Sequence, residues 1–224
     1  MKQFFLVFSS FCIAFITNAQ SEKYTAAMQK NIALIDSAKT NNQLMSLESN
    51  FERIGDAEKT EWLPYYYAAL CQLSSIRNSI EQGAVQKDAT GVEAMISKAD
   101  ALIAKAESLD KPNAEIYVLK NMLATDNIMI NPMVNGQKYG PIAAEYLSKA
   151  AQLDATNPRP VLMAAMAKYY TPVQWGGDKK KAAELFNKAD QLDKAFKPAS
   201  TLHPTWGRGL IDRGVLKLNQ ESTK

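Results

Sequence analysis

The polar stretch WGGDKKKA, residues 175–182, combines residue types that can bind an anion. Gly176 and Gly177 allow backbone angles that other residues avoid, and Asp178 is a natural N-cap for a following helix. Lysines crowd that helix start, where the helix dipole already favours negative charge: Lys179, Lys180 and Lys181. Two interpretations compete, an anion site at the free N–H groups or a solvated turn that Asp178 caps. The second is favoured, because Asp178 would occupy the donors that an anion needs.

Aromatic side chains are the other residues suited to recognising a ligand or partner. Trp and Tyr combine a large apolar area with a polar tip, and interfaces are enriched in them. The candidate contact residues are Trp62, Tyr66, Tyr67, Tyr170, Trp175 and Trp206. Trp62 and residues 65–67 span too wide an arc of one helix for a single buried stripe, so at least one of these tyrosines should face a groove or solvent. Packing between helices is the competing role for each ring.

Residues for catalysis or metal binding are few. His203 is the single histidine and precedes Pro204 in an expected loop, with no zinc-ligand spacing around it. No nucleophile elbow, phosphate loop or dinucleotide-binding signature is present. Glu48 and Glu52 have the spacing of helix neighbours, which solvated helix faces produce often. This inventory predicts a non-enzymatic protein with no metal site and no cofactor.

A repeated apolar pattern defines the elements that would carry these residues. The pattern Ala-x3-large-x2-Ala-x2-Leu-Asp occurs three times, ending at Asp110, Asp154 and Asp193, so the copies lie 44 and 39 residues apart. Its steps of four, three and three place the apolar residues on one face of a helix. Small residues on that face allow a second helix to approach closely: Ala99, Ala106, Ala143, Ala150, Ala182 and Ala189. The spacing accommodates two helices and two connections per copy.

The repeat resembles the second helix of a tetratricopeptide (TPR) repeat, and LDATNPRPVLMAAMAKYY, residues 153–170, is similar to a TPR junction. The likeness covers residues 94–207, where TPVQWGGDKKKAAELFNKA and LHPTWGR resemble exported bacterial TPR-like proteins without an assigned activity. Lys120 and Asn121 stand where the consensus has Leu and Gly, and the repeat is longer than the usual length of about 34 residues. The resemblance implies an all-α, TPR-like α-α superhelix, a right-handed solenoid of about four helical hairpins plus a C-terminal capping helix.

The expected helices follow from apolar periodicity and turn residues. They pair residues 22–39 with 43–54, 61–80 with 90–109, 114–126 with 142–153, and 158–170 with 179–192, with a short last helix near 207–218. Asn113 and Asn157 are expected N-caps. The fifteen-residue connection at 127–141, rich in Ile, Met and Val, is expected to pack over the array or to form a wall of a binding surface. No segment alternates with period two, so no sheet is expected.

The N-terminus has the pattern of a cleaved secretory signal, with Lys2, an apolar run from Phe4 to Ile16 and small residues before Gln20. Residues 1–19 would be the signal, and residues 20–224 a single helical repeat domain, periplasmic or secreted and not membrane-spanning. Removal of Lys2 would reduce the net charge from +3 to +2, too little for a nucleic-acid-binding surface. Cys71 would then be the one remaining thiol, so no intramolecular disulfide is expected.

Three functions are compatible with these features. The leading hypothesis is a non-enzymatic scaffold module of the cell envelope that presents a concave groove to a peptide or partner protein. The first alternative is a protein that binds a small molecule or glycan, with exposed Trp and Tyr as stacking platforms. The second alternative, a carboxylate-based enzyme, is disfavoured by the residue inventory. A protein or peptide partner is therefore expected, and nucleic acid is not.

Overall fold

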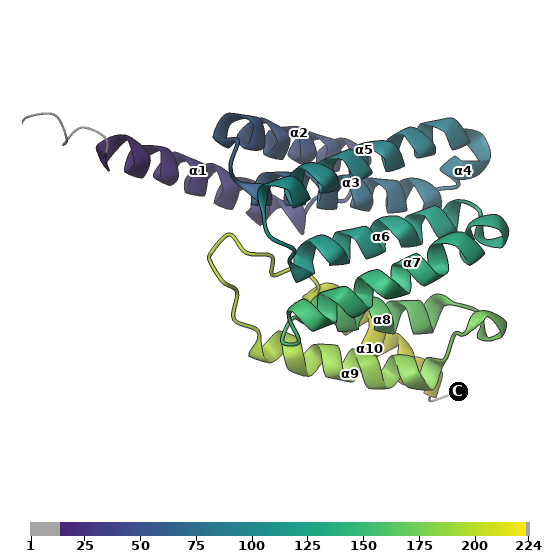
Figure 1. The fold of residues 1–224 in the computed structure, drawn as a ribbon. Helices are drawn as coiled ribbons and strands as arrows, with labels where there is room; N and C mark the ends of the chain where they lie inside the picture. Colours follow the sequence, from purple (N-terminus) through teal and green to yellow (C-terminus); the bar gives the residue numbers. More distant parts are fainter. Residues whose placement is uncertain (1–13, 223–224) are drawn as a thin grey trace, which may run out of the picture.

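Helices make up the regular structure of the described chain, and no strand occurs within it (Figure 1). The computed structural model describes the backbone of residues 14–222 and the side chains of residues 22–221. The predicted export signal, residues 1–19, lies outside the part whose side chains are described. The prediction of an all-α fold is confirmed for the described residues.

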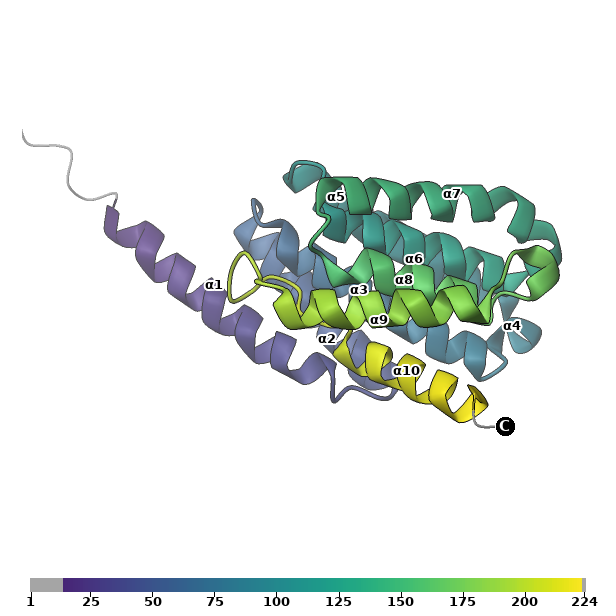
Figure 2. The same ribbon diagram turned by 90° about the horizontal axis from the view of Figure 1, so that it is seen from below.

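The helices stack as hairpins whose members pack side by side. Their bounds are α1 (Ala14–Ile35), α2 (Asn41–Glu58), α3 (Trp62–Glu81), α4 (Ala84–Lys87), α5 (Ala89–Leu109), α6 (Ala114–Ile130), α7 (Pro132–Leu153), α8 (Pro158–Tyr170), the 3-10 helix η1 (Val173–Trp175), α9 (Lys179–Ala195) and α10 (Arg208–Ser222). The closest pairs are α2 with α3, α3 with α5, α6 with α7 and α8 with α9 (Figure 1). The last helix, α10, packs against α9 (Figure 2).

Polar side chains at the helix starts explain where several helices begin. Thr40 and Gln43 form a reciprocal capping box at the start of α2. Asn113, Asn157 and Asp178 each accept a backbone N–H from the first turn of α6, α8 and α9. These bonds satisfy donors that a helix start otherwise leaves without a partner. The three predicted N-caps are confirmed.

The alanines of the repeated pattern are all buried, as the pattern predicts. Ala99, Ala106, Ala150, Ala182 and Ala189 have no exposed area, and Ala143 retains 8%. A single core runs through the stack and joins the five fully buried alanines to large side chains such as Phe51, Ile103 and Phe186. Small residues at these contacts let neighbouring helices approach, while the larger ones fill the remaining space.

The prediction of a long connection at 127–141 is wrong. α6 continues to Ile130 and α7 begins at Pro132, so one residue, Asn131, joins the two helices. The Asn131 side chain caps α7, and Pro132 takes the first helical position, where its missing N–H costs no hydrogen bond. Pro141 lies inside α7. The Asn and Pro residues that suggested a loop therefore start a helix or are accommodated within one.

The tyrosines of α3 are buried, contrary to the prediction that at least one faces a groove or solvent. Tyr65, Tyr66 and Tyr67 have exposed fractions of 6%, 0% and 2%. α3 lies in the middle of the fold, where α2, α5 and α6 all pack against it. A helix covered from several sides buries a much wider arc than one apolar stripe.

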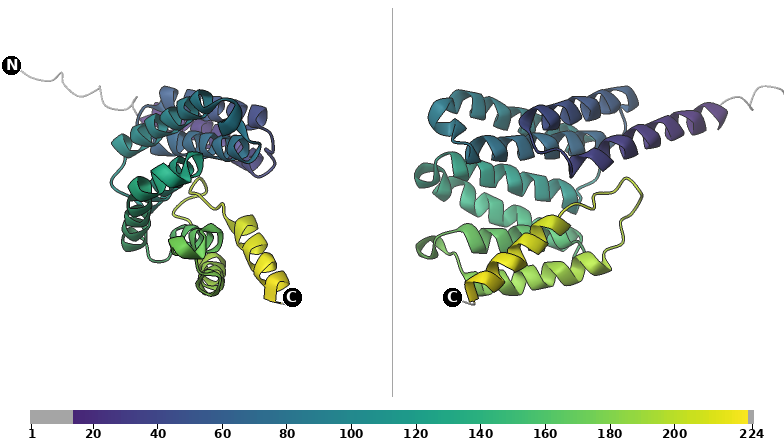
Figure 3. Two further views of the ribbon diagram at one scale, coloured as in Figure 1. Left: turned by 90° about the vertical axis from the view of Figure 1, so that its right-hand side faces the viewer. Right: turned by 180° about the vertical axis from the view of Figure 1, so that it is seen from behind.

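Residues 196–207, which we call the C-terminal strap, connect α9 to α10. Seen along the helix axes, the hairpins follow a curve, and the strap lies on its inside (Figure 3, left). α10 lies beside α8 and α9, on the side away from α7 (Figure 3). In the described part of the chain, no helix combines the length and apolar character needed to cross a membrane.

Candidate functional site

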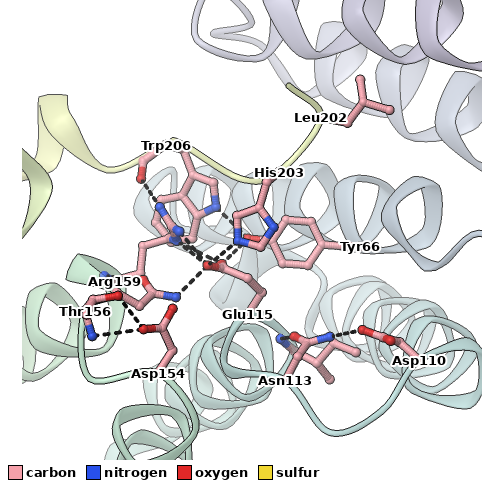
Figure 4. Close-up of polar contacts among 12 residues, drawn as sticks. Tyr66, Asp110, Asn113, Glu115, Asp154, Thr156, Arg159, Leu202, His203 and Trp206 are labelled. Carbon is pink, nitrogen blue, oxygen red and sulfur yellow. Dashed lines mark hydrogen bonds and ion pairs between the residues drawn. The ribbon is translucent and has the colours of Figure 1, made fainter. Parts of the chain in front are cut away.

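A buried ion pair lies where α6, α8 and the strap meet. Glu115 of α6 is 2% exposed and Arg159 of α8 is fully buried. The Arg159 Nε donates to both carboxylate oxygens of Glu115, at 2.9 and 2.8 Å. Asn157 donates its amide to Oε1 at 2.6 Å, and the Tyr66 hydroxyl donates to Oε2 at 3.0 Å (Figure 4). Both oxygens therefore have partners, which a buried charge requires.

The electrostatics of this cluster keep Arg159 charged and Tyr66 neutral. Burial by itself would lower the pKa of Arg159, but the adjacent Glu115 carboxylate outweighs it and raises that pKa. Burial raises the pKa of Tyr66 well above its usual range, and the negative charge of Glu115 adds to the effect. Tyr66 is therefore a hydrogen-bond donor rather than an acid or a nucleophile.

The strap is fastened to this cluster through backbone and side-chain contacts. The indole N–H of Trp206 donates to the Tyr66 hydroxyl at 2.7 Å, and the Arg159 Nη1 donates to the Trp206 carbonyl oxygen at 3.4 Å (Figure 4). The Tyr67 hydroxyl donates to the Leu202 carbonyl oxygen at 2.9 Å. The inner face of α3 and α8 thus holds a non-helical segment of the same chain.

His203 of the strap points toward the ion pair. Its Nε2 lies 3.8 Å from the Glu115 Oε1, and its side chain is 20% exposed. Burial lowers the pKa of His203, and the Glu115 carboxylate opposes that effect only in part. His203 is therefore neutral at neutral pH. No group of three His, Cys, Asp or Glu residues among those described is placed to hold a metal ion.

Glu115 and Arg159 were not among the predicted site residues. They lie 44 residues apart, and neither belongs to a motif with fixed spacing. A local signal was present in PRPVLM, residues 158–163, where Arg159 stands between two prolines ahead of an apolar run. The polar groups around this pair bond to one another and to the strap, which is the arrangement of a structural element. We call it the clamp; it consists of Tyr66, Tyr67, Glu115, Asn157, Arg159 and Trp206.

The six predicted aromatic contact residues fall into two groups. Tyr66, Tyr67 and Trp206 belong to the clamp, and Trp62 packs edge-on against Tyr66 with ring centroids 5.6 Å apart. The other two are exposed, Tyr170 by 61% and Trp175 by 56%. Of the six predicted aromatic contact residues, these two are the ones that the structure exposes to solvent.

Tyr170 and Trp175 lie on the same side of the molecule as four other exposed apolar side chains. Ten large apolar side chains of the described chain are exposed, and six of them lie at the α6–α7 and α8–α9 connections: Met129, Met133, Val134, Tyr170, Val173 and Trp175. Both connections lie at the same ends of the helices, on the right in Figure 1 (see also Figure 3). We call these six residues the tip surface. Exposed apolar groups gathered in this way mark binding surfaces.

Close backbone contacts hold the turn that presents Trp175. Gly176 has a φ of 93°, and a Cβ on Gly177 would lie 1.7 Å from the Thr171 carbonyl oxygen. The Lys168 ammonium donates to the Gly176 carbonyl oxygen at 2.8 Å. These contacts explain the Gly-Gly pair and keep the indole of Trp175 directed outward from a fixed turn.

The lysines of the predicted anion site are arranged as the capping interpretation requires. The Lys181 N–H donates to the Asp178 carboxylate at 2.9 Å. Lys179 pairs with Glu221 at 2.7 Å, and Lys181 pairs with Glu184 at 2.8 Å. The backbone donor that an anion would use is therefore already bonded.

Two shallow hollows lie elsewhere on the surface, the first largely polar and the second more apolar. One, of about 540 Å³, is lined by Ser46, Ser49, Asn50, Glu52, Arg53 and Asp56. The other, of about 390 Å³, is lined by Asp56, Lys59, Tyr65, Lys105, Ser108 and Leu109. Small-molecule sites are mostly apolar with a few polar groups, which the first hollow does not match and the second, a shallow one, matches in part.

The described chain is thus an all-α protein of stacked hairpins, with an internal clamp and an apolar tip surface. Among solved structures it is similar to the HusA haemophore from Porphyromonas gingivalis, with a TM-score of 0.76 and 26% sequence identity over 90% of this chain and 95% of that one. No protein-family model and no curated protein sequence matches the chain. A haemophore is a binding protein, so this likeness supports a binding function in general.

Proposed function

We propose that this chain is an exported, non-enzymatic protein that binds haem or a related porphyrin at the tip surface. The observation that carries the proposal is the similarity to a haemophore, which extends over nearly the whole of both chains. Export is supported by the signal pattern of residues 1–19. A non-enzymatic role is supported by the lack of a catalytic motif in the sequence.

The chemistry of the tip surface suits a flat, largely apolar ligand. Tyr170 and Trp175 offer exposed rings, which stack well on other aromatic systems. Met133, Val134 and Val173 are exposed by 67% to 80% and add apolar area, of which the Met133 side chain is the flexible part. Because α8 packs against both α6 and α7, the two connections that carry these side chains are neighbours in the stack.

We also propose that the hairpins form a divergent TPR-like superhelix with a right-handed turn. The support is the repeated alanine pattern, whose copies lie 44 and 39 residues apart and whose alanines are buried. In such a superhelix the inner face would be the groove for a peptide. Here the strap covers part of that face, with Leu202 and Pro204 buried against it.

Binding of a peptide or partner protein is the second candidate function. It is favoured by the hydrogen bonds from Tyr67 and Arg159 to backbone carbonyl oxygens of the strap, since such bonds recognise extended chains. A Trp206→Ala variant would loosen the strap, and a labelled peptide with the sequence of residues 196–207 should then bind it. Failure of that peptide to raise fluorescence anisotropy would count against this candidate.

An absorbance titration tests the proposed porphyrin binding. The mature chain, residues 20–224, should produce a saturable change in the haemin spectrum. Trp175→Ala and Tyr170→Ala should each weaken binding by about 1 kcal/mol, roughly fivefold, because each removes an exposed ring. Met45→Ala is the matched control, since Met45 is 52% exposed but lies on α2, outside the tip surface. No saturable change with haemin, or equal affinities for all three variants, would refute the proposal.

A further inference from the structure

Two exposed lysines of α9 and α10, the helices that follow the exposed rings of the tip surface, lack a carboxylate partner among the described residues. Lys217 donates to the Tyr170 hydroxyl at 3.1 Å and lies over the same ring, 5.3 Å from its centroid. Lys180 is exposed in the first turn of α9, five residues after Trp175. Within residues 22–221, neither lysine forms an ion pair with Asp or Glu.

Lys180 differs from the lysines on either side of it, which have carboxylate partners. Lys179 and Lys181, on either side of Lys180, are neutralised by Glu221 and Glu184. An unpaired lysine in the first turn of a helix is also unfavourable, because the helix dipole places positive charge there. A negative group of a ligand beside Lys180 would offset that cost.

We propose that Lys180 and Lys217 bind the carboxylates of the ligand, so that the tip surface selects tetrapyrroles with free carboxylates over neutral ones. This inference rests on the proposed porphyrin binding. A porphyrin such as haem has an apolar ring and two propionates on one edge. Its ring would stack on Tyr170 and Trp175 while its propionates reach the two ammonium groups. Both pairs would lie at the exposed rim of the contact and would weaken with salt.

The test compares protoporphyrin IX with its dimethyl ester, which keeps the ring but lacks the negative charges. Each is titrated into the mature chain and into a Lys180→Gln/Lys217→Gln variant at low ionic strength. The variant should bind protoporphyrin IX about three- to tenfold more weakly, because exposed ion pairs contribute modestly. It should bind the ester as the unchanged chain does, and high salt should shrink the difference for protoporphyrin IX.

Two further variants separate charge from structure. Lys111→Gln removes an exposed lysine at the α5–α6 connection, which lies at the opposite ends of the helices (Figure 1). It should change the affinity for neither protoporphyrin IX nor its ester. The single variant Lys217→Arg, in which Lys180 is unchanged, keeps the charge beside Tyr170. It should bind protoporphyrin IX and its ester as the unchanged chain does. Equal losses for protoporphyrin IX and its ester, or no loss for either, would overturn the inference while leaving porphyrin binding intact. If the unchanged chain binds neither compound, the proposed function fails and this inference fails with it.

Discussion

Replacing Glu115 by Gln should strongly destabilise the protein. The change keeps the shape of the side chain but removes the charge that compensates Arg159, which has no exposed area. It also turns one acceptor toward the donors Arg159, Asn157 and Tyr66 into an amide NH2 group, which itself donates.

The expected size of the effect follows from the burial of the pair. Breaking a buried ion pair by removing one partner costs about 3–5 kcal/mol, because the remaining charge is left without compensation. For a chain of this length, each kcal/mol lowers Tm by about 2–4 °C. The Tm of Glu115→Gln should therefore fall by roughly 6–20 °C.

Urea unfolding followed by far-UV circular dichroism measures this loss, with thermal melts alongside. Glu145→Gln is the matched control, because Glu145 pairs with Lys149 at 2.7 Å on an exposed helix face. Its cost should stay below about 0.5 kcal/mol. A Glu115→Leu/Arg159→Met variant should recover much of the stability, since it removes both charges together. A Glu115→Gln loss no larger than that of Glu145→Gln would refute the role assigned to the buried pair.

Three further predictions concern other parts of the core. Ala150→Leu should cost about 1–3 kcal/mol in urea unfolding, because Ala150 has no exposed area and the larger side chain would overpack the contact; an unchanged midpoint would contradict close packing there. Burial lowers the pKa of His203 below its ordinary 6.5, so the unfolded chain takes up this proton at higher pH than the folded chain. The free energy of unfolding should therefore fall as pH drops below 6.5, and His203→Gln should show a shallower pH dependence; equal slopes would argue against it. Burial raises the pKa of Cys71 to about 12, so a thiol reagent at mildly alkaline pH should modify it only after unfolding, and rapid reaction of the native protein would exclude this buried placement.

Features that depend on neighbouring residues were predictable from the sequence. Asn113 and Asn157 cap helices because their side chains bond to N–H groups two or three residues away. The burial of Ala106 and Ala150 was predictable because helical periodicity alone assigns them to one face of a helix. Local signals of this kind act within a turn or two, and the sequence displays them directly.

Features that depend on contacts between distant residues were not predictable in the same way. Glu115 and Arg159 meet because α6 and α8 pack against each other, and no local pattern announces that contact. The same holds for Tyr66, which lies under several helices and bonds to Trp206 of the strap, 140 residues along the chain. At Asn131 the local signal was present but ambiguous, because Asn followed by Pro marks a helix start as readily as a loop.

The strap changes how stable the two ends of the stack are relative to each other. In an open array each unit touches only its neighbours, so a terminal unit can detach while the rest remains folded. Here Tyr67 and Leu202 are bonded although 135 residues separate them, and Tyr66 and Trp206 are bonded across 140 residues. Detachment of the strap would break these bonds and uncover Tyr66 and Tyr67 of α3, which couples the unfolding of α3 to that of the C-terminal segment. The same bonds can form only after residue 206 has been synthesised. The contact between α3 and the strap is therefore a late event in the folding of the chain.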